Sequence, residues 1–110
     1  MQSITRQELE EKINQGEDFA LVEVLANETF RRYHLPGAIN VPINDQFGDR
    51  IQQAIPDHDK PVVVYCTNAH CTASPQAGRE LERLGYSTVL DYEGGKEDWR
   101  DAGLPIERGS

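Results

Sequence analysis

Two cysteines separated by four residues follow a run of β-branched side chains. The stretch VVVYCTNAHCT spans residues 62–72, and Cys66 and Cys71 are the two cysteines of the chain. A cysteine thiolate is a nucleophile and a metal ligand, and its reactivity depends on its surroundings. A disulfide between residues so close together would close only a small ring, which makes a purely structural staple a poor explanation. The pair therefore indicates reactive sulfur chemistry.

The segments on either side of Cys66 predict how the loop would act. Residues 61–65 are typical of a buried strand, and Ala73, Ala77, Leu81 and Leu84 follow the spacing of one helical face. A loop between a strand and a helix N-terminus gathers N–H groups that lack intrahelical partners and attract anions. We expect these amides to favour a Cys66 thiolate. The candidate binding residues are Thr67, Asn68, Ala69, His70, Cys71 and Thr72.

Other interpretations of these side chains stay open. Cys66 could be an inert thiol that closes a buried strand. Cys71 could be a resolving thiol, which attacks a persulfide or sulfenate on Cys66, or a small side chain packed under the helix. His70 could tune the local potential or be an exposed bystander. Cys66, His70 and Cys71 give three metal ligands, but zinc normally needs a fourth and none is evident nearby, so no metal site is expected.

The charge of the chain limits the classes of partner. The 11 Lys and Arg residues face 19 Asp and Glu residues, which gives a net charge of −8. This balance disfavours nucleic acid and anionic membrane surfaces as partners. From Cys66 through Gly78 there is no carboxylate, Lys or Arg. The acidic chain therefore keeps negative charge away from the cysteines.

The length of 110 residues fits one domain over residues 1–110. No apolar run is long enough to span a membrane, and the first six residues lack the order of a secretory signal. We therefore expect a cytoplasmic protein.

Helices and strands are expected to alternate along the chain. Thr5 and Glu8 form a predicted capping box, Asn27 is a predicted cap, and Pro42 makes residues 39–43 a brief or edge strand. Further strands are predicted at 19–24, 61–65 and 87–90, and further helices at 47–55, 73–84 and 96–102, the last around a core Trp99. This order predicts an α/β fold, with a central, mainly parallel sheet and helices on both faces. Ligands bind such sheets beyond the carboxyl ends of the strands, where Cys66 lies.

Three segments together resemble rhodanese-like single-domain sulfurtransferases over nearly the whole chain. Residues 19–24 and 33–42 resemble the family's strand, short helix and H-I-P-G-A-I-N-I-P element. Residues 62–66 resemble the strand that delivers the nucleophile, and residues 92–105 resemble the closing L-x-G-G-x-x-x-W and A-G-L-P pattern. The resemblance implies a rhodanese-like fold.

The resemblance also implies an activity. Cys66 would attack the outer sulfur of thiosulfate or a persulfide, become a persulfide itself, and pass that sulfur to cyanide or to a thiol, including one on a protein. No metal or organic cofactor is then needed. The alternative is a non-catalytic rhodanese-like module that binds a partner or senses redox state. Related phosphatases and arsenate reductases have one more loop residue, which argues against that activity here.

The chain departs from the family pattern at two places. The family usually shows C-x-x-x-x-R, whereas Cys71 stands here in the place of the arginine. Because arginine binds dianions with two parallel hydrogen bonds, we expect weak thiosulfate use and a preference for persulfide donors. Glu23 and Leu25 stand where the family usually has Asp and Arg. Glu23 therefore needs another partner if it is buried.

Overall fold

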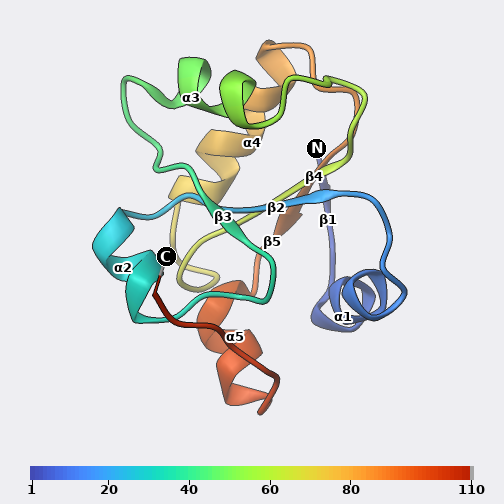
Figure 1. Cartoon of the computed structure of the whole chain (residues 1–110), viewed down its shortest axis with the longest axis vertical. Coiled ribbons are helices and arrows are strands. Elements are labelled where there is room, and N and C mark those ends of the chain that lie inside the picture. Colours follow the sequence, from blue (N-terminus) through green and yellow to red (C-terminus); the bar gives the residue numbers. More distant parts are fainter. Residues whose placement is uncertain (110) are drawn as a thin grey trace.

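A five-stranded parallel sheet forms the centre of the computed structural model, which describes residues 1–109 (Figure 1). The strand order is β1-β5-β4-β2-β3. The strands are β1 (Gln2–Ser3), β2 (Ala20–Glu23), β3 (Ile39–Asn40), β4 (Val62–Tyr65) and β5 (Val89–Tyr92). The continuous run of β-branched residues thus forms the central strand, as predicted, and the short segment before Pro42 lies at an edge.

Within the described residues, five helices accompany the sheet. They are α1 (Arg6–Asn14), α2 (Asn27–Arg32), α3 (Phe47–Ala54), α4 (Ala73–Arg83) and α5 (Gly95–Asp101). Figure 1 shows α3 and α4 gathered apart from α1 and α5. None of the helices within residues 1–109 is long and apolar enough to cross a membrane.

Alternate residues of the central strands pack into two cores, because successive side chains of a strand point to opposite faces. Val64 packs on one face with Ile51 of α3 and Leu81 of α4. Val63 packs on the other face with Leu9 of α1 and Trp99 of α5. The predicted covering of both faces by helices is confirmed, and Trp99 is a core residue that is 2% exposed.

Local signals set several helix ends. Thr5 and Glu8 form the predicted capping box at the start of α1. Gly85 ends α4 in a left-handed conformation, with φ of 97°. The prediction for Asn27 was wrong in detail, since α2 starts at this residue and no side chain caps the helix.

Two strands differ from the sequence prediction. The strand predicted at 87–90 lies at Val89–Tyr92, two residues later. The two-residue β1 was missed because so short a segment carries no periodic pattern; it is defined by its pairing with β5.

Candidate active site

The loop that joins β4 to α4 lies at the carboxyl end of the sheet and contains both cysteines. Cys66 follows β4 directly and is 1% exposed, whereas Cys71 is half-buried. The two sulfurs form a disulfide. The Cα atoms of Cys66 and Cys71 are 6.5 Å apart, which is within the range usual for disulfides. In this oxidised form the Cys66 sulfur is bonded to Cys71 and is not a free nucleophile.

Asn68 holds the loop in its folded-back shape. Its backbone oxygen accepts a hydrogen bond of 3.1 Å from the Cys71 N–H. Its side-chain oxygen accepts a hydrogen bond of 3.0 Å from the His70 N–H, and its side-chain nitrogen donates to Glu97 of α5 at 3.0 Å. These hydrogen bonds bring Cys71 back toward Cys66, and none of them involves a sulfur atom.

The start of α5 supports the first part of the loop. The Lys96 N–H donates to the Cys66 carbonyl at 2.9 Å, and the Glu97 N–H donates to the Thr67 carbonyl at 3.0 Å. Gly95 makes this approach possible: a Cβ atom there would lie 2.5 Å from the Thr67 carbonyl carbon and 2.6 Å from the Asn68 nitrogen. Its φ of 74° also favours glycine.

The six predicted binding residues are neighbours in this loop, but their exposure differs. Three are half-buried and three are exposed; the half-buried ones are Thr67, Asn68 and Cys71, and the exposed ones are Ala69, His70 and Thr72. Within residues 1–109, no hydrogen bond is found from the N–H groups of Thr67, Asn68, Ala69 and Thr72. The loop thus has main-chain donors available for an anionic ligand.

A buried ion pair lies between β2 and α5. The Lys96 ammonium is 3.2 Å from the Glu23 carboxylate, and the side chains are 2% and 0% exposed. The Tyr65 hydroxyl donates to Glu23 at 3.0 Å, while Lys96 also donates to the carbonyls of Thr29 and Tyr33 at 2.9 and 2.8 Å. Lys96 is therefore the partner that a buried Glu23 requires.

Burial opposes the charges of this pair. Loss of water raises the pKa of Glu23, and the Lys96 charge opposes that rise. Loss of water likewise lowers the pKa of Lys96, and the Glu23 charge opposes that fall. Each charge is therefore stabilised mainly by its partner and by the surrounding hydrogen bonds.

A small hollow of about 170 Å³ lies beside the disulfide. Its lining includes Cys71, Ser74 and Asp91. Asp91 is 3% exposed, and its Oδ1 atom has no hydrogen-bond partner within residues 1–109. Burial raises the pKa of Asp91, and the hydroxyl of Ser74 opposes this shift. Asp91 could not be linked to this site from the sequence, because only the fold brings it to the Cys71 loop.

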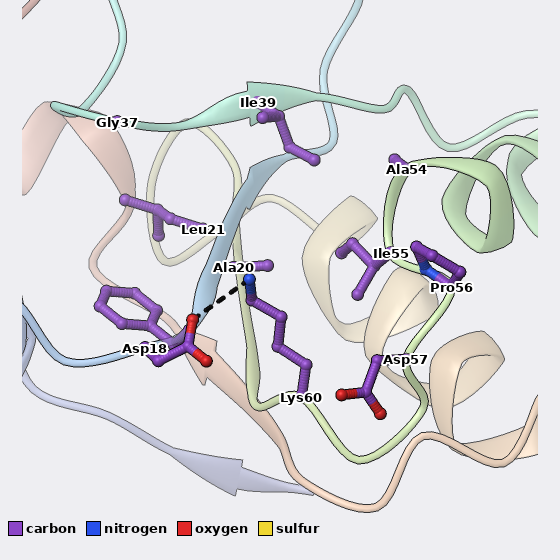
Figure 2. Close-up of a pocket in the computed structure, with 11 residues that line it drawn as sticks. Asp18, Ala20, Leu21, Gly37, Ile39, Ala54, Ile55, Pro56, Asp57 and Lys60 are labelled. Atoms are coloured by element: carbon purple, nitrogen blue, oxygen red, sulfur yellow. Dashed lines mark ion pairs between the residues drawn. The ribbon is translucent and has the colours of Figure 1, made fainter.

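A larger hollow of about 460 Å³ lies at the other end of the strands (Figure 2). It includes Ala20 at the start of β2 and Lys60, which precedes β4. The Lys60 ammonium is 3.3 Å from the Asp18 carboxylate. No cysteine or histidine lines this hollow, and Cys66 follows the opposite end of β4, so we do not assign the sulfur chemistry to it.

The histidines have separate surroundings. His34 is buried and stacks on Phe30, with 3.7 Å between ring centroids. His58 stacks on Tyr86, and His70 is exposed in the loop. Over residues 1–109, no group of three or more His, Cys, Asp and Glu side chains is placed to hold a metal ion.

Comparisons with known proteins agree with this geometry. The rhodanese-like domain model matches residues 5–102. The thiosulfate sulfurtransferase GlpE of Pseudomonas savastanoi pv. phaseolicola (strain 1448A / Race 6) is 38% identical over 80 residues, which are 73% of this chain and 71% of that protein. A crystal structure of thiosulfate sulfurtransferase from Pseudomonas aeruginosa superposes with a TM-score of 0.86 and 28% identity, covering 99% of this chain and 20% of that one.

A further relative has a different description. The HTH-type transcriptional regulator Rv0324 of Mycobacterium tuberculosis (strain ATCC 25618 / H37Rv) is 37% identical over 115 residues. The match covers 98% of this chain but 46% of the regulator, so the chain spans less than half the length of that relative. The family match, the parallel sheet and the position of Cys66 agree, and the chain belongs to the rhodanese-like domain family.

Proposed function

We propose that this chain is a sulfurtransferase in which Cys66 carries the transferred sulfur as a persulfide. The reduced Cys66 thiolate attacks the outer sulfur of a donor, and the donor's remaining group leaves with the bonding electrons. An acceptor thiol or cyanide then attacks the outer sulfur of the persulfide, and the Cys66 thiolate leaves. Donor and acceptor are small sulfur compounds or thiols, including protein thiols, and neither nucleic acid nor a membrane is a partner.

One observation carries the proposal. Cys66 follows the central parallel strand directly, and the loop after it leads into the N-terminus of α4. Unpaired loop amides and the helix dipole favour negative charge on the sulfur, first as thiolate and then as persulfide. Relatives with thiosulfate sulfurtransferase in their names support the same class of reaction.

The loop composition favours persulfides as donors over thiosulfate. Cys71 stands at the position of the usual arginine, and residues 66–78 contain no Lys or Arg. A thiosulfate dianion would therefore lack a bidentate cationic anchor in this segment.

The oxidised loop must be reduced before the first step. Reduction of the Cys66–Cys71 bond frees the nucleophile, and a reducing compartment such as the cytoplasm would keep it free. A cytoplasmic location is therefore part of the proposal.

Mass spectrometry of the intact protein tests the function. Cys71→Ser protein is reduced with a dithiol, desalted, and incubated with glutathione persulfide or with thiosulfate. Cys66→Ser protein is treated in the same way as the control. We expect Cys71→Ser protein to gain one sulfur atom from the persulfide and much less from thiosulfate, and Cys66→Ser protein to gain none. Failure of Cys71→Ser to gain sulfur from either donor would refute the proposal.

A redox-sensing module is the second candidate, because the disulfide can report the redox state without any transfer. The regulator among the relatives is consistent with a module of this kind. The two candidates differ in one result: a sensor forms and breaks the disulfide reversibly, but Cys66 takes up no sulfur in the persulfide experiment.

A further inference from the structure

We propose that Cys71 is a second nucleophile, which attacks the Cys66 persulfide and releases its outer sulfur as hydrosulfide. This inference rests on the proposed function, because Cys66 must first carry a sulfur. It adds an activity to simple transfer: the chain itself would reduce sulfane sulfur to hydrosulfide and finish as the Cys66–Cys71 disulfide.

The geometry of the loop brings the two sulfurs together. The disulfide shows that Cys71 can reach Cys66 within the folded domain, with their Cα atoms 6.5 Å apart. The turn around Asn68 maintains this approach through three hydrogen bonds: Asn68 accepts from the N–H groups of Cys71 and His70 and donates to Glu97. The Cys66 end is fixed independently by the hydrogen bond from Lys96. An attack by Cys71 therefore needs little rearrangement of the main chain.

The chemical step balances without an external oxidant. The Cys71 sulfur attacks the inner sulfur, which is the Cys66 Sγ atom, and the bond between the inner and outer sulfurs breaks. The outer sulfur leaves with the bonding electron pair and takes the proton of the Cys71 thiol, so it departs as hydrosulfide. The sulfane sulfur is reduced and the two cysteines become a disulfide.

Regeneration needs a dithiol reductant, and the exposure of the two cysteines determines where it attacks. Cys71 is half-buried and lines the hollow of about 170 Å³, whereas Cys66 is 1% exposed. An external thiolate therefore reaches the Cys71 sulfur first, and Cys66 is the leaving thiolate. A second attack, by the other thiol of the reductant, frees Cys71 and oxidises the reductant to its own disulfide.

The environment of Cys71 distinguishes it from a side chain that only packs. Asp91 lines the same hollow, is 3% exposed, and has an Oδ1 atom without a partner within residues 1–109. A buried polar atom without a partner, on a residue that lines a hollow beside a sulfur, needs an explanation, and we assign this hollow to a polar group that enters or leaves, here hydrosulfide or the attacking thiol. The hollow thus provides a space for the leaving or entering sulfur.

Hydrosulfide release measures the step directly. Dithiol-reduced, desalted protein is mixed with glutathione persulfide, and hydrosulfide is followed with a sulfide-selective electrode while intact masses are recorded. For the wild type we expect release stoichiometric with protein and a product lighter than reduced protein by two hydrogens. For Cys71→Ser we expect a stable product with one extra sulfur and release no faster than with Cys66→Ser, which reports the glutathione background.

The outcomes separate this inference from the proposed function. If Cys71→Ser protein takes up no sulfur, Cys66 is not a persulfide carrier, and both proposals fail. If Cys71→Ser protein takes up sulfur and the wild type also keeps it, without disulfide or excess hydrosulfide, only the role of Cys71 is refuted. Peptide mapping of the wild-type product must place the new bond between Cys66 and Cys71, and a bond between two molecules would also refute it.

Discussion

Two pairs of side chains flank the start of the loop, and they hold it in different ways. Cys66 and Cys71 are five residues apart, with Cys71 half-buried, whereas Glu23 and Lys96 are 73 residues apart and almost wholly buried. Chain entropy predicts that the short disulfide ring contributes about 2 kcal/mol to the free energy of unfolding. Removal of one partner from a buried ion pair costs about 3–5 kcal/mol. The Cys66–Cys71 disulfide, which must open before Cys66 can react, thus joins residues close in sequence. The Glu23–Lys96 pair, which must persist for the protein to stay folded, joins distant elements.

The largest expected effect comes from breaking the buried pair. Lys96→Met leaves the Glu23 carboxylate buried without its cation, and we expect the free energy of unfolding to fall by about 3–5 kcal/mol. Urea denaturation of the reduced protein measures the change. The matched control is Glu23→Gln combined with Lys96→Met, which removes both charges and should be less destabilised than Lys96→Met. Equal destabilisation of the two proteins would show that the lost charge pairing is not the cause.

A smaller effect is expected where α5 meets the loop. In Gly95→Ala the new methyl group would collide with the main chain of Thr67 and Asn68, at a residue with positive φ. We expect a loss of about 1–3 kcal/mol in the free energy of unfolding and slower sulfur uptake by Cys66. Gly103→Ala is the control, because its φ of 76° is similar but no atom of residues 1–109 outside its own neighbours in the chain lies within 4 Å of the added group. If both variants take up sulfur at the same rate, the contact of Gly95 does not position Cys66.

The smallest expected effect concerns Asp91, a buried acid that forms no ion pair within residues 1–109. Because burial raises the pKa of Asp91 in the folded protein above its ordinary value, its contribution to stability is greatest below that ordinary value and is lost as the pH rises through the folded pKa. Asp91→Asn should therefore gain stability relative to the wild type as the pH rises from acidic to neutral. Thermal unfolding at a series of pH values measures this, with the exposed Asp49→Asn as control. A difference that does not depend on pH would contradict the prediction.

The position of Cys66 could be predicted from the sequence, but the residues that hold its loop in place could not. A continuous β-branched run before Cys66 is enough to place it after a central buried strand. The Glu23–Lys96 pair was not predictable in the same way, because it depends on the pairing of β2 with β4 and on where α5 begins. Gly95 could be recognised from the sequence only as part of the L-x-G-G pattern, because its contact with Thr67 exists only in the folded chain.

The two cysteines are synthesised before the residues of α5 whose N–H groups hold their loop in place. The amides that bind the carbonyls of Cys66 and Thr67 belong to Lys96 and Glu97, which come much later in the sequence. A nascent chain that has not yet reached Gly95 therefore lacks the two hydrogen bonds from α5 that hold the main chain at Cys66 and Thr67. We expect ordered sulfur chemistry to begin only after translation has passed this point, so that incomplete chains on the ribosome carry two ordinary cysteines.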